Sequence, residues 1–371
     1  MPDQNIPHPI PVPSVEAIDF PALPLMPEAG DRPSGDLARL NLNEAPMPPS
    51  PLALAAAQVA LADSHRYPDH HAVALAGTIA ARTGIAADRI VFGNGSGELL
   101  VQCAQVALDR GDEAVMPDPT FPTCGKGVQM TGAHIVKVPL RPDGANDVAA
   151  MLSAITPRTR LFYLCTPNNP TGNILGEADL ERAIREVPAT CLLVIDEAYF
   201  EFACGGDEPD TLTLLRSRTG PWVVTRTFSK AYCMAGLRVG YALCSDEGLK
   251  RGFSRIRHNF NVSRPSLAAA RAAFEDAAYM RAAVAETVAR REQLRAGLER
   301  LGFVVLPSFA NFLTVRFNGS ATALAQALHG QGIAVQALGW PDANGSLRIT
   351  IGAAEENERV LAAIENQLEA A

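Results

Sequence analysis

The sequence predicts an α/β fold, with a mostly parallel sheet of seven strands between helices and a smaller α+β domain after it. Short apolar runs rich in β-branched residues, with helical patterns between several of them, recur at residues 89–93, 113–117, 134–140, 160–165, 191–196, 222–226 and 239–244. Strands that alternate with helices form parallel sheets that are covered on both faces. After residue 264 the pattern changes to a long helical stretch and two isolated strand-like runs.

The helical patterns and the remaining segments divide the chain into three regions. Helices are expected over residues 97–108 and 177–186, and residues 267–301 predict one long helix, broken at most once. Strands at 312–317 and 347–351 follow, with a helix near 321–328 and another at the C-terminus. We therefore expect an extended, proline-rich arm over residues 1–35, a large domain over 36–264 and a small domain over 265–371. Residues 36–55 could pack with the small domain.

Composition argues against several classes of protein. The 371 residues allow about two domains, and 47% apolar with 19% charged residues is typical of a globular chain. A net charge of −8 without a basic cluster argues against nucleic-acid binding. The apolar stretches are too short to span a membrane, and the first 35 residues lack the basic start and apolar core of a secretory signal.

The cysteines favour a reducing compartment, and the histidines give no indication of a metal site. The seven cysteines are odd in number and include no CxxC pair, and several fall in expected strands. We therefore expect reduced core thiols in a cytoplasmic protein. The seven histidines show no spacing typical of metal ligands, so no metal site is expected.

Lys230 is the first candidate for chemistry. It follows Ser229 just after the apolar run 222–226, and Arg238 lies eight residues later. A lysine among small, hydroxyl and apolar residues loses its proton more readily, and only the neutral amine is a nucleophile. Arg238 could hold a phosphate in the same pocket through paired hydrogen bonds. Most lysines, taken alone, are solvated surface charges.

Three other strand ends carry polar residues. Asp196 ends the run 191–196, where it could pair with a buried cation or cap a helix. Asn169 lies in the turn Pro-Asn-Asn-Pro-Thr-Gly at 167–172, which is either a rigid loop or a means of fixing the asparagine for a ligand. The turn Gly-Asn-Gly-Ser-Gly-Glu at 93–98 precedes a helix, so its amides would suit a phosphate. Ligands of such sheets sit at the carboxyl ends of the strands.

A lysine amine, a carboxylate, a fixed asparagine and a phosphate cradle are together what pyridoxal phosphate requires. The ordered motifs Asn-Pro-Thr-Gly, Asp-Glu-Ala-Tyr, Ser-Lys and Leu-Arg-Ile-Thr begin at residues 169, 196, 229 and 347. This combination resembles the fold-type I aminotransferases that depend on pyridoxal phosphate, and within them the histidinol-phosphate aminotransferase-like subgroup. The resemblance extends from residue 40 to residue 352.

The resemblance implies roles for the residues nearest the reaction. Lys230 would form the Schiff base with the cofactor and later carry the α-proton. Asp196 would keep the pyridine nitrogen protonated, and Asn169 and Tyr199 would contact the phenolic oxygen. The catalytic set is thus Lys230, Asp196 and Tyr199.

The resemblance also implies which residues hold the phosphate and the substrate. The phosphate would be held by Ser229, Arg238 and the amides of Ser96 and Gly97. Tyr67 would reach the phosphate bound in the partner subunit, which implies a homodimer with shared active sites. Arg348 would clamp the anionic group of the substrate, and Asn43 would face it.

Two positions depart from the subgroup. Cys124 stands where a tyrosine usually stacks on the cofactor ring, and Phe121 is nearby. Gln336 stands where an arginine usually helps Arg348 bind the substrate phosphate. Loss of that charge-assisted pair would cost about 2–3 kcal/mol, unless another cation such as Arg257 supplies the charge.

The expected activity is amino transfer from histidinol phosphate to 2-oxoglutarate, in histidine biosynthesis, or that of a close paralogue. The alternative is an aromatic or other amino-acid aminotransferase whose substrate carries a single carboxylate, as the neutral Gln336 would suit. A decarboxylase that uses pyridoxal phosphate and a non-catalytic protein that binds it are the remaining alternatives on this scaffold. Neither nucleic acid nor a membrane is an expected partner.

Overall fold

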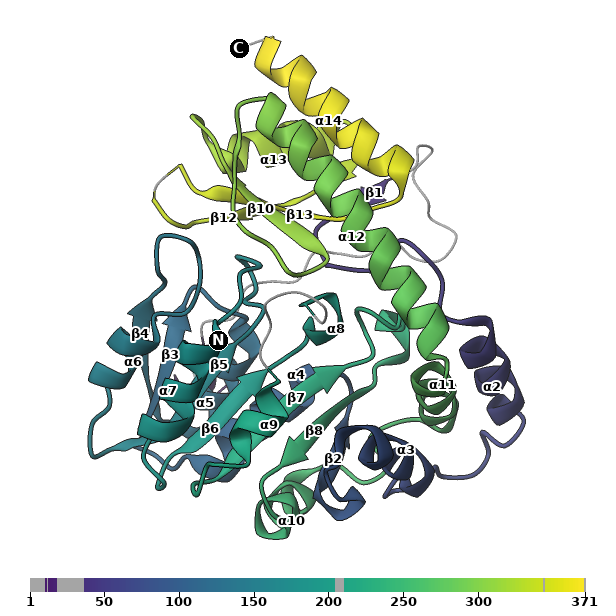
Figure 1. Ribbon diagram of the computed structural model, residues 1–371, viewed down its shortest axis with the longest axis vertical. Helices are drawn as coiled ribbons and strands as arrows, with labels where there is room; N and C mark the ends of the chain where they lie inside the picture. Colours follow the sequence, from purple (N-terminus) through teal and green to yellow (C-terminus); the bar gives the residue numbers. More distant parts are fainter. Residues whose placement is uncertain (1–10, 12, 19–36, 204–209, 343, 370–371) are drawn as a thin grey trace, which may run out of the picture.

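The computed structural model describes residues 11, 13–18, 37–203, 210–342 and 344–369, and these residues form two sheet-centred layers (Figure 1). The large layer contains a seven-stranded sheet in the order β2-β8-β7-β6-β5-β3-β4. Its strands are β2 (Ile90–Gly93), β3 (Glu113–Asp118), β4 (His134–Pro139), β5 (Thr159–Cys165), β6 (Leu192–Asp196), β7 (Trp222–Thr227) and β8 (Gly240–Cys244). Only β8 runs antiparallel to its neighbours, so the mostly parallel sheet is as predicted.

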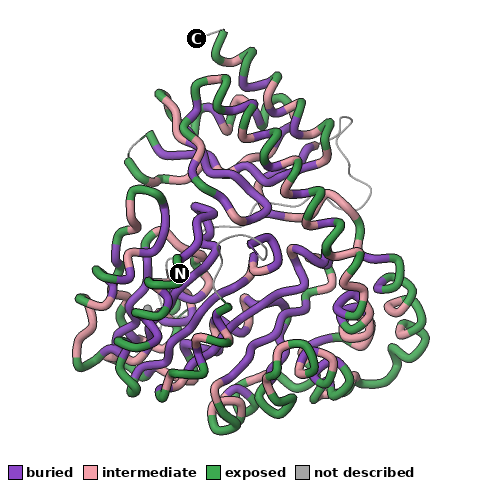
Figure 2. The backbone as a smooth tube through the Cα atoms, viewed as in Figure 1, coloured by how far each residue is buried: buried purple, intermediate pink, exposed green. Residues whose placement is uncertain are grey.

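Helices cover both faces of the large sheet because its strands are apolar on both sides. In β6, Leu193 and Ile195 pack into one hydrophobic cluster, whereas Leu192 and Val194 pack into the other. The first cluster takes buried side chains from α3 (Val73–Thr83), α6 (Val148–Ser153), α7 (Glu177–Glu186) and α11 (Arg264–Glu275). The second takes them from α4 (Ser96–Ala107), α5 (Pro122–Thr131) and α10 (Glu247–Ile256). Figure 2 shows the strands as the buried interior of this layer.

Polar residues begin the helices that frame the sheet. Ser50 caps α2 (Pro51–Leu61) and Asp210 caps α9 (Thr211–Leu215), each through its side-chain oxygen. Helix α8 (Phe200–Ala203) follows β6 after Tyr199, and two short 3-10 turns cover residues Ala87–Arg89 and Ala235–Leu237. The second turn leads into β8 through Arg238, whose φ is 53°.

The small layer is built on an antiparallel sheet in the order β12-β13-β10-β9. Its strands are β9 (Val304–Val305), β10 (Phe312–Arg316), β12 (Gln336–Leu338) and β13 (Ser346–Thr350). Helices α12 (Ala277–Arg300), α13 (Ala321–Gly330) and α14 (Ala354–Glu369) contribute buried residues to its own hydrophobic cluster. Strand β1 (Ala38–Arg39) pairs in parallel with β11 (Ile333–Ala334). The segment that begins at residue 37 therefore lies beside the small domain.

The long helical stretch is divided at Asp276. This residue ends α11 and caps α12, because its side chain accepts from the backbone N–H of Tyr279. Alanines 269, 270 and 273 of α11 belong to the core of the large sheet, and α11 packs on α2. The change from one core to the other comes within α12, because Met280, Val284 and Val288 still pack against the core of the large sheet, whereas Leu294 and Leu298 belong to that of the small sheet.

Most of the expected N-terminal arm lies outside the described residues. Its described part contains α1 (Pro13–Glu16), a single helical turn. The expectation of an extended backbone is therefore wrong at these residues, and the φ of a proline is as compatible with the first turn of a helix as with an extended chain.

The described residues hold six cysteines, all free and five of them buried, and Cys204 lies outside that part. Over the same part of the chain, the helices include none with the length and apolarity needed to cross a membrane.

Candidate active site

Lys230 lies in the turn after β7, where its amine meets backbone carbonyls of the N-terminal segment. Its Nζ donates to the oxygens of Leu42 and Asn43 at 3.2 and 2.8 Å. Burial, together with the positive charges of Arg348 and Arg238, lowers the pKa of Lys230 to about 7. The amine is therefore largely neutral at slightly alkaline pH, as a nucleophile requires.

Arg348 brings the small sheet into the same site. It lies on β13, donates to Asn169 Oδ1 at 2.7 Å and also donates to the carbonyl oxygen of Asn41. Its Nε is buried without a hydrogen-bond partner among the described residues. Burial lowers the pKa of this guanidinium, which the nearby Tyr199 partly offsets. Residues 41–43 thus accept hydrogen bonds from Arg348 at one end and from Lys230 at the other.

Asn43 fixes Tyr199 from the side of the small domain. Its Nδ2 donates to Tyr199 Oη at 2.9 Å, and its Oδ1 accepts from Thr350 Oγ1 at 3.1 Å. The side-chain amide is therefore oriented by both of its ends. Burial raises the pKa of Tyr199, so the phenol keeps its proton and can donate it to a ligand.

Asp196 is held by two hydroxyl groups at the end of β6. Tyr163 Oη donates to its Oδ2 at 3.0 Å, and Thr225 Oγ1 donates to its Oδ1 at 3.1 Å. Tyr163 lies on β5 and Thr225 on β7, so the neighbouring strands on both sides supply the donors. Burial raises the pKa of Asp196 to about 6, against the effect of both hydrogen bonds.

Arg238 and the first amides of α4 come together where β2, α4 and β8 meet. Arg238 Nη1 donates to Ser229 Oγ at 3.3 Å, and Nη2 donates to Asn94 O at 3.1 Å. A Cβ at Gly240 would overlap the backbone nitrogen of Ser96, and one at Gly95 would overlap the Arg238 guanidinium. Two glycines therefore leave room for an amide at the start of α4 and a guanidinium to approach the same point.

Comparison with known proteins decides the family. A family model described as aminotransferase class I and II matches residues 36–364. The chain belongs to this aminotransferase family. The family resemblance and the predicted fold-type I architecture are thereby confirmed.

Individual relatives and solved structures support the same assignment. Histidinol-phosphate aminotransferase of Moorella thermoacetica is 36% identical over 329 residues, which cover 89% of this chain and 85% of that protein. Histidinol-phosphate aminotransferase 2 of Pseudomonas fluorescens is 40% identical over 328 residues, 88% of each chain. The crystal structure of histidinol-phosphate aminotransferase from Sinorhizobium meliloti in complex with pyridoxal-5'-phosphate matches with a TM-score of 0.88 and 30% identity, covering 96% of this chain and 97% of that one.

The structure of the aminotransferase brings most of the predicted site residues together. Hydrogen bonds join Lys230 to Asn43 and Asn43 to Tyr199, and another hydrogen bond joins Arg348 to Asn169. Gln336 lies directly across from Arg348 on β12, but its amide donates to the carbonyl of Ala337.

Two of the predicted site residues make none of the hydrogen bonds just described. Cys124 is fully buried in α5, where burial raises the pKa of its thiol, and Phe121 packs against the same cluster. Tyr67 is 76% exposed and stacks on Phe260 at a centroid distance of 4.5 Å. Its phenol therefore remains available at the surface of a single chain.

Sequence reasoning missed the residues that hold the predicted ones. Tyr163 and Thr225 bind Asp196, Thr350 binds Asn43, and Thr227 Oγ1 donates to Ser229 Oγ at 3.0 Å. One signal was present for Thr225. It is the first polar residue after the apolar run 222–224, as Asp196 is after the run 192–195, and the parallel register of β6 and β7 places the two side by side.

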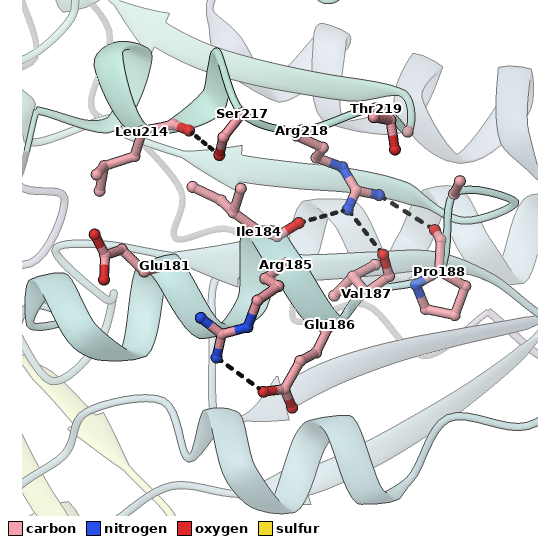
Figure 3. Close-up of a pocket in the computed structure, with 12 residues that line it drawn as sticks. Glu181, Ile184, Arg185, Glu186, Val187, Pro188, Leu214, Ser217, Arg218 and Thr219 are labelled. Atoms are coloured by element: carbon pink, nitrogen blue, oxygen red, sulfur yellow. Dashed lines mark hydrogen bonds and ion pairs between the residues drawn. The ribbon is translucent and has the colours of Figure 1, made fainter.

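A separate pocket of about 470 Å³ opens on the aminotransferase surface between α7 and the turn after α9 (Figure 3). Arg218 crosses it and donates to the carbonyls of Ile184, Val187, Pro188 and Cys191. None of the predicted site residues lines this pocket. Arg218 thus donates hydrogen bonds to carbonyl groups at the C-terminal end of α7, where a helix offers no further N–H partners, and this is a structural role.

Proposed function

We propose that this aminotransferase uses pyridoxal phosphate to transfer the amino group of histidinol phosphate to 2-oxoglutarate. The observation that carries the proposal is the position of Arg348, one short segment of backbone away from the Lys230 amine. Its buried Nε has no hydrogen-bond partner within the described part of the chain. Both substrates carry an anionic group that a guanidinium can bind through paired hydrogen bonds. The names of relatives at 36% and 40% identity support the choice of amino donor.

The residues present fit this cofactor. The glycines at 95 and 240 let the Arg238 guanidinium and the first amide of α4 pack close to the same point, as the binding of a phosphate group needs. Ser96, Gly97, Ser229 and Arg238 would hold the phosphate, Asp196 would face the pyridine nitrogen, and Asn169 and Tyr199 would meet the phenolic oxygen. When bound, the cofactor supplies an electron sink for the bonds at the substrate α-carbon.

Residues of the chain itself would supply the nucleophile, the group that carries the proton, and the hydrogen bonds that orient the ligand. Lys230, with a pKa of about 7, offers a neutral amine as nucleophile and can afterwards take up and return a proton at Nζ. Asp196 contributes a negative charge that its two hydroxyl partners stabilise. Because Asn43 donates to Tyr199 Oη, the one phenolic proton is left for a ligand.

A second candidate function is amino transfer from a substrate with a single carboxylate, such as an aromatic amino acid. Gln336 favours it, because the residue opposite Arg348 is neutral and its amide is bonded to the backbone. A carboxylate needs one guanidinium, whereas a phosphate gains from two.

We also assign this aminotransferase to a cytoplasmic homodimer. Large apolar side chains are exposed along α2 and at the start of α3, where Leu52, Val59, Leu61 and Val73 are 57–78% exposed. Such a patch is typical of a surface that another chain covers. Tyr67 lies in the same stretch, and the free thiols of the described residues agree with a reducing compartment.

The test is a donor screen with the purified holoenzyme. Histidinol phosphate, phenylalanine, tyrosine, leucine and ornithine are compared by formation of glutamate from 2-oxoglutarate. Histidinol phosphate should give the highest kcat/KM, and Lys230→Ala should abolish turnover without changing the fold. Borohydride should fix the cofactor to Lys230, as read by peptide mass. Preference for phenylalanine or tyrosine would support the second candidate, and absence of amino transfer from every donor would reject both.

A further inference from the structure

Tyr163 is a buried tyrosine whose hydroxyl donates to the carboxylate of Asp196. It lies two residues before the end of β5, is fully buried, and donates to Asp196 Oδ2 at 3.0 Å. Its Cα pairs with Val194 of β6, and Asp196 is the next residue of β6 with a side chain on the same face. The phenol of Tyr163 therefore points two residues further along β6, toward the carboxyl ends of the strands, where the candidate site lies.

The two oxygens of Asp196 have different donors. Thr225 Oγ1 occupies Oδ1, and Tyr163 occupies Oδ2. The backbone N–H of Ala198 also donates to this carboxylate. A carboxylate that accepts such hydrogen bonds keeps its charge more easily, and its plane is fixed here by hydroxyl donors on two different strands. The wider surroundings are apolar or thiol groups, since Cys124 and Cys165 belong to the same cluster as Tyr163. In such surroundings each donor has a large effect.

Packing alone would not require a hydroxyl at this position. A phenylalanine would fill the same volume without burying a polar group, and the cluster around residue 163 offers apolar neighbours such as Val194 and Leu161. A buried tyrosine is stable only if its hydroxyl finds a partner, and here the partner is the residue on which the chemistry would depend.

We propose that Tyr163 is a positioning residue for Asp196, whose hydrogen bond holds the carboxylate ionised and oriented toward the ring nitrogen of the cofactor. This inference rests on the proposed function. It assigns to Tyr163 no contact with the substrate or the cofactor, so its effect must pass through Asp196. Removing the hydroxyl should weaken the carboxylate's hold on a protonated ring nitrogen.

The experiment compares Tyr163→Phe with Tyr241→Phe, which removes another fully buried tyrosine hydroxyl from the same sheet, on β8. Both variants are purified as holoenzymes with the wild type. Three quantities are measured: the dissociation constant of pyridoxal phosphate by equilibrium dialysis, the pH titration of the bound cofactor's absorbance, and the pH profile of kcat. We expect Tyr163→Phe to bind the cofactor about tenfold more weakly, to shift the absorbance titration and to lower kcat with little change in KM. Tyr241→Phe should match the wild type.

A double-mutant cycle decides whether the effect passes through Asp196. In an Asp196→Asn background, the added Tyr163→Phe substitution should change cofactor affinity less than twofold. An equal loss in both backgrounds, or absorbance titrations that coincide for Tyr163→Phe and Tyr241→Phe, would overturn the proposal. If Tyr163→Phe does not fold, Tyr163→Met replaces it. A wild type that binds no cofactor would reject the proposed function itself, which is a distinct outcome.

Discussion

The side-chain amide of Asn43 donates to the phenol oxygen of Tyr199 at 2.9 Å across 156 positions of sequence. Asn43 belongs to the segment that pairs with the small sheet, and Tyr199 follows β6 of the large sheet. The bond therefore ties the two layers together at the site. Asn43 also has a φ of 54°, a backbone conformation that asparagine adopts more readily than most residues. Both its backbone conformation and its side-chain hydrogen bonds therefore favour asparagine at this position.

Replacing Asn43 should reduce both stability and turnover. Asn43→Ala removes the donor to Tyr199 and leaves a Cβ at positive φ, so we expect a loss of about 2–3 kcal/mol in the free energy of unfolding. Asn43→Gly removes the same bond without the backbone strain and should lose less stability but as much kcat/KM. Urea unfolding and steady-state kinetics measure the two quantities. Equal stability of the two variants would show that strain is absent.

The amine of Lys230 makes stability depend on pH. Burial lowers its pKa from 10.5 to about 7, so the unfolded chain binds more protons than the folded one between these values, and stability at this position rises with pH across that window. The apo form of Lys230→Met should melt at a higher temperature than the apo wild type near pH 7, and the difference should shrink toward pH 10.5. The exposed Lys137 is the control position for the same substitution. A pH-independent difference would contradict this origin.

Gln336 tests which anion the site prefers. Gln336→Arg places a second guanidinium opposite Arg348 on β13. We expect kcat/KM for histidinol phosphate to rise about tenfold, because a charge-assisted hydrogen bond to phosphate is gained. Gln336→Met keeps the length without a donor and should not reproduce the gain. High native activity on histidinol phosphate with no change in the arginine variant would show that the charge comes from elsewhere.

Gly240 should be indispensable for the proposed phosphate site. A Cβ at this position overlaps the backbone nitrogen of Ser96, so Gly240→Ala must displace the start of α4 or β8. We expect cofactor affinity to fall at least about tenfold. Gly236→Ala is the matched control, since a Cβ there meets no atom within 4 Å. Equilibrium dialysis with pyridoxal phosphate measures both, and unchanged affinity in Gly240→Ala would place the phosphate elsewhere.

A charge on the exposed face of α2 should separate the proposed dimer. Val59 is 78% exposed there, and Val59→Asp would place a carboxylate in an apolar interface. Sedimentation velocity should show a monomer with little activity. Val304→Asp, on an exposed valine of the small sheet, should remain a dimer. Two variants that sediment alike would exclude this face as the interface.

The sequence was sufficient to place the candidate site residues near strand ends, but not to find the residues that hydrogen-bond to them. Lys230, Asp196 and Asn169 lie at strand ends, and a strand end can be read from a local change in hydrophobicity. Tyr163 looked like an ordinary core residue, because its contact with Asp196 depends on how β5 and β6 pair. The break at Asp276 and the packing of α11 on α2 likewise depend on tertiary contacts. No local pattern reports these.

Residues 41–43 accept hydrogen bonds from Arg348 and from Lys230 on three successive carbonyl groups. An anion that draws Arg348 away from Asn41 releases one end of this segment, and a cofactor that engages Lys230 releases the other. The two events share a piece of backbone only three peptides long. Binding at either end of the site is therefore expected to change the free energy of binding at the other end through this shared segment.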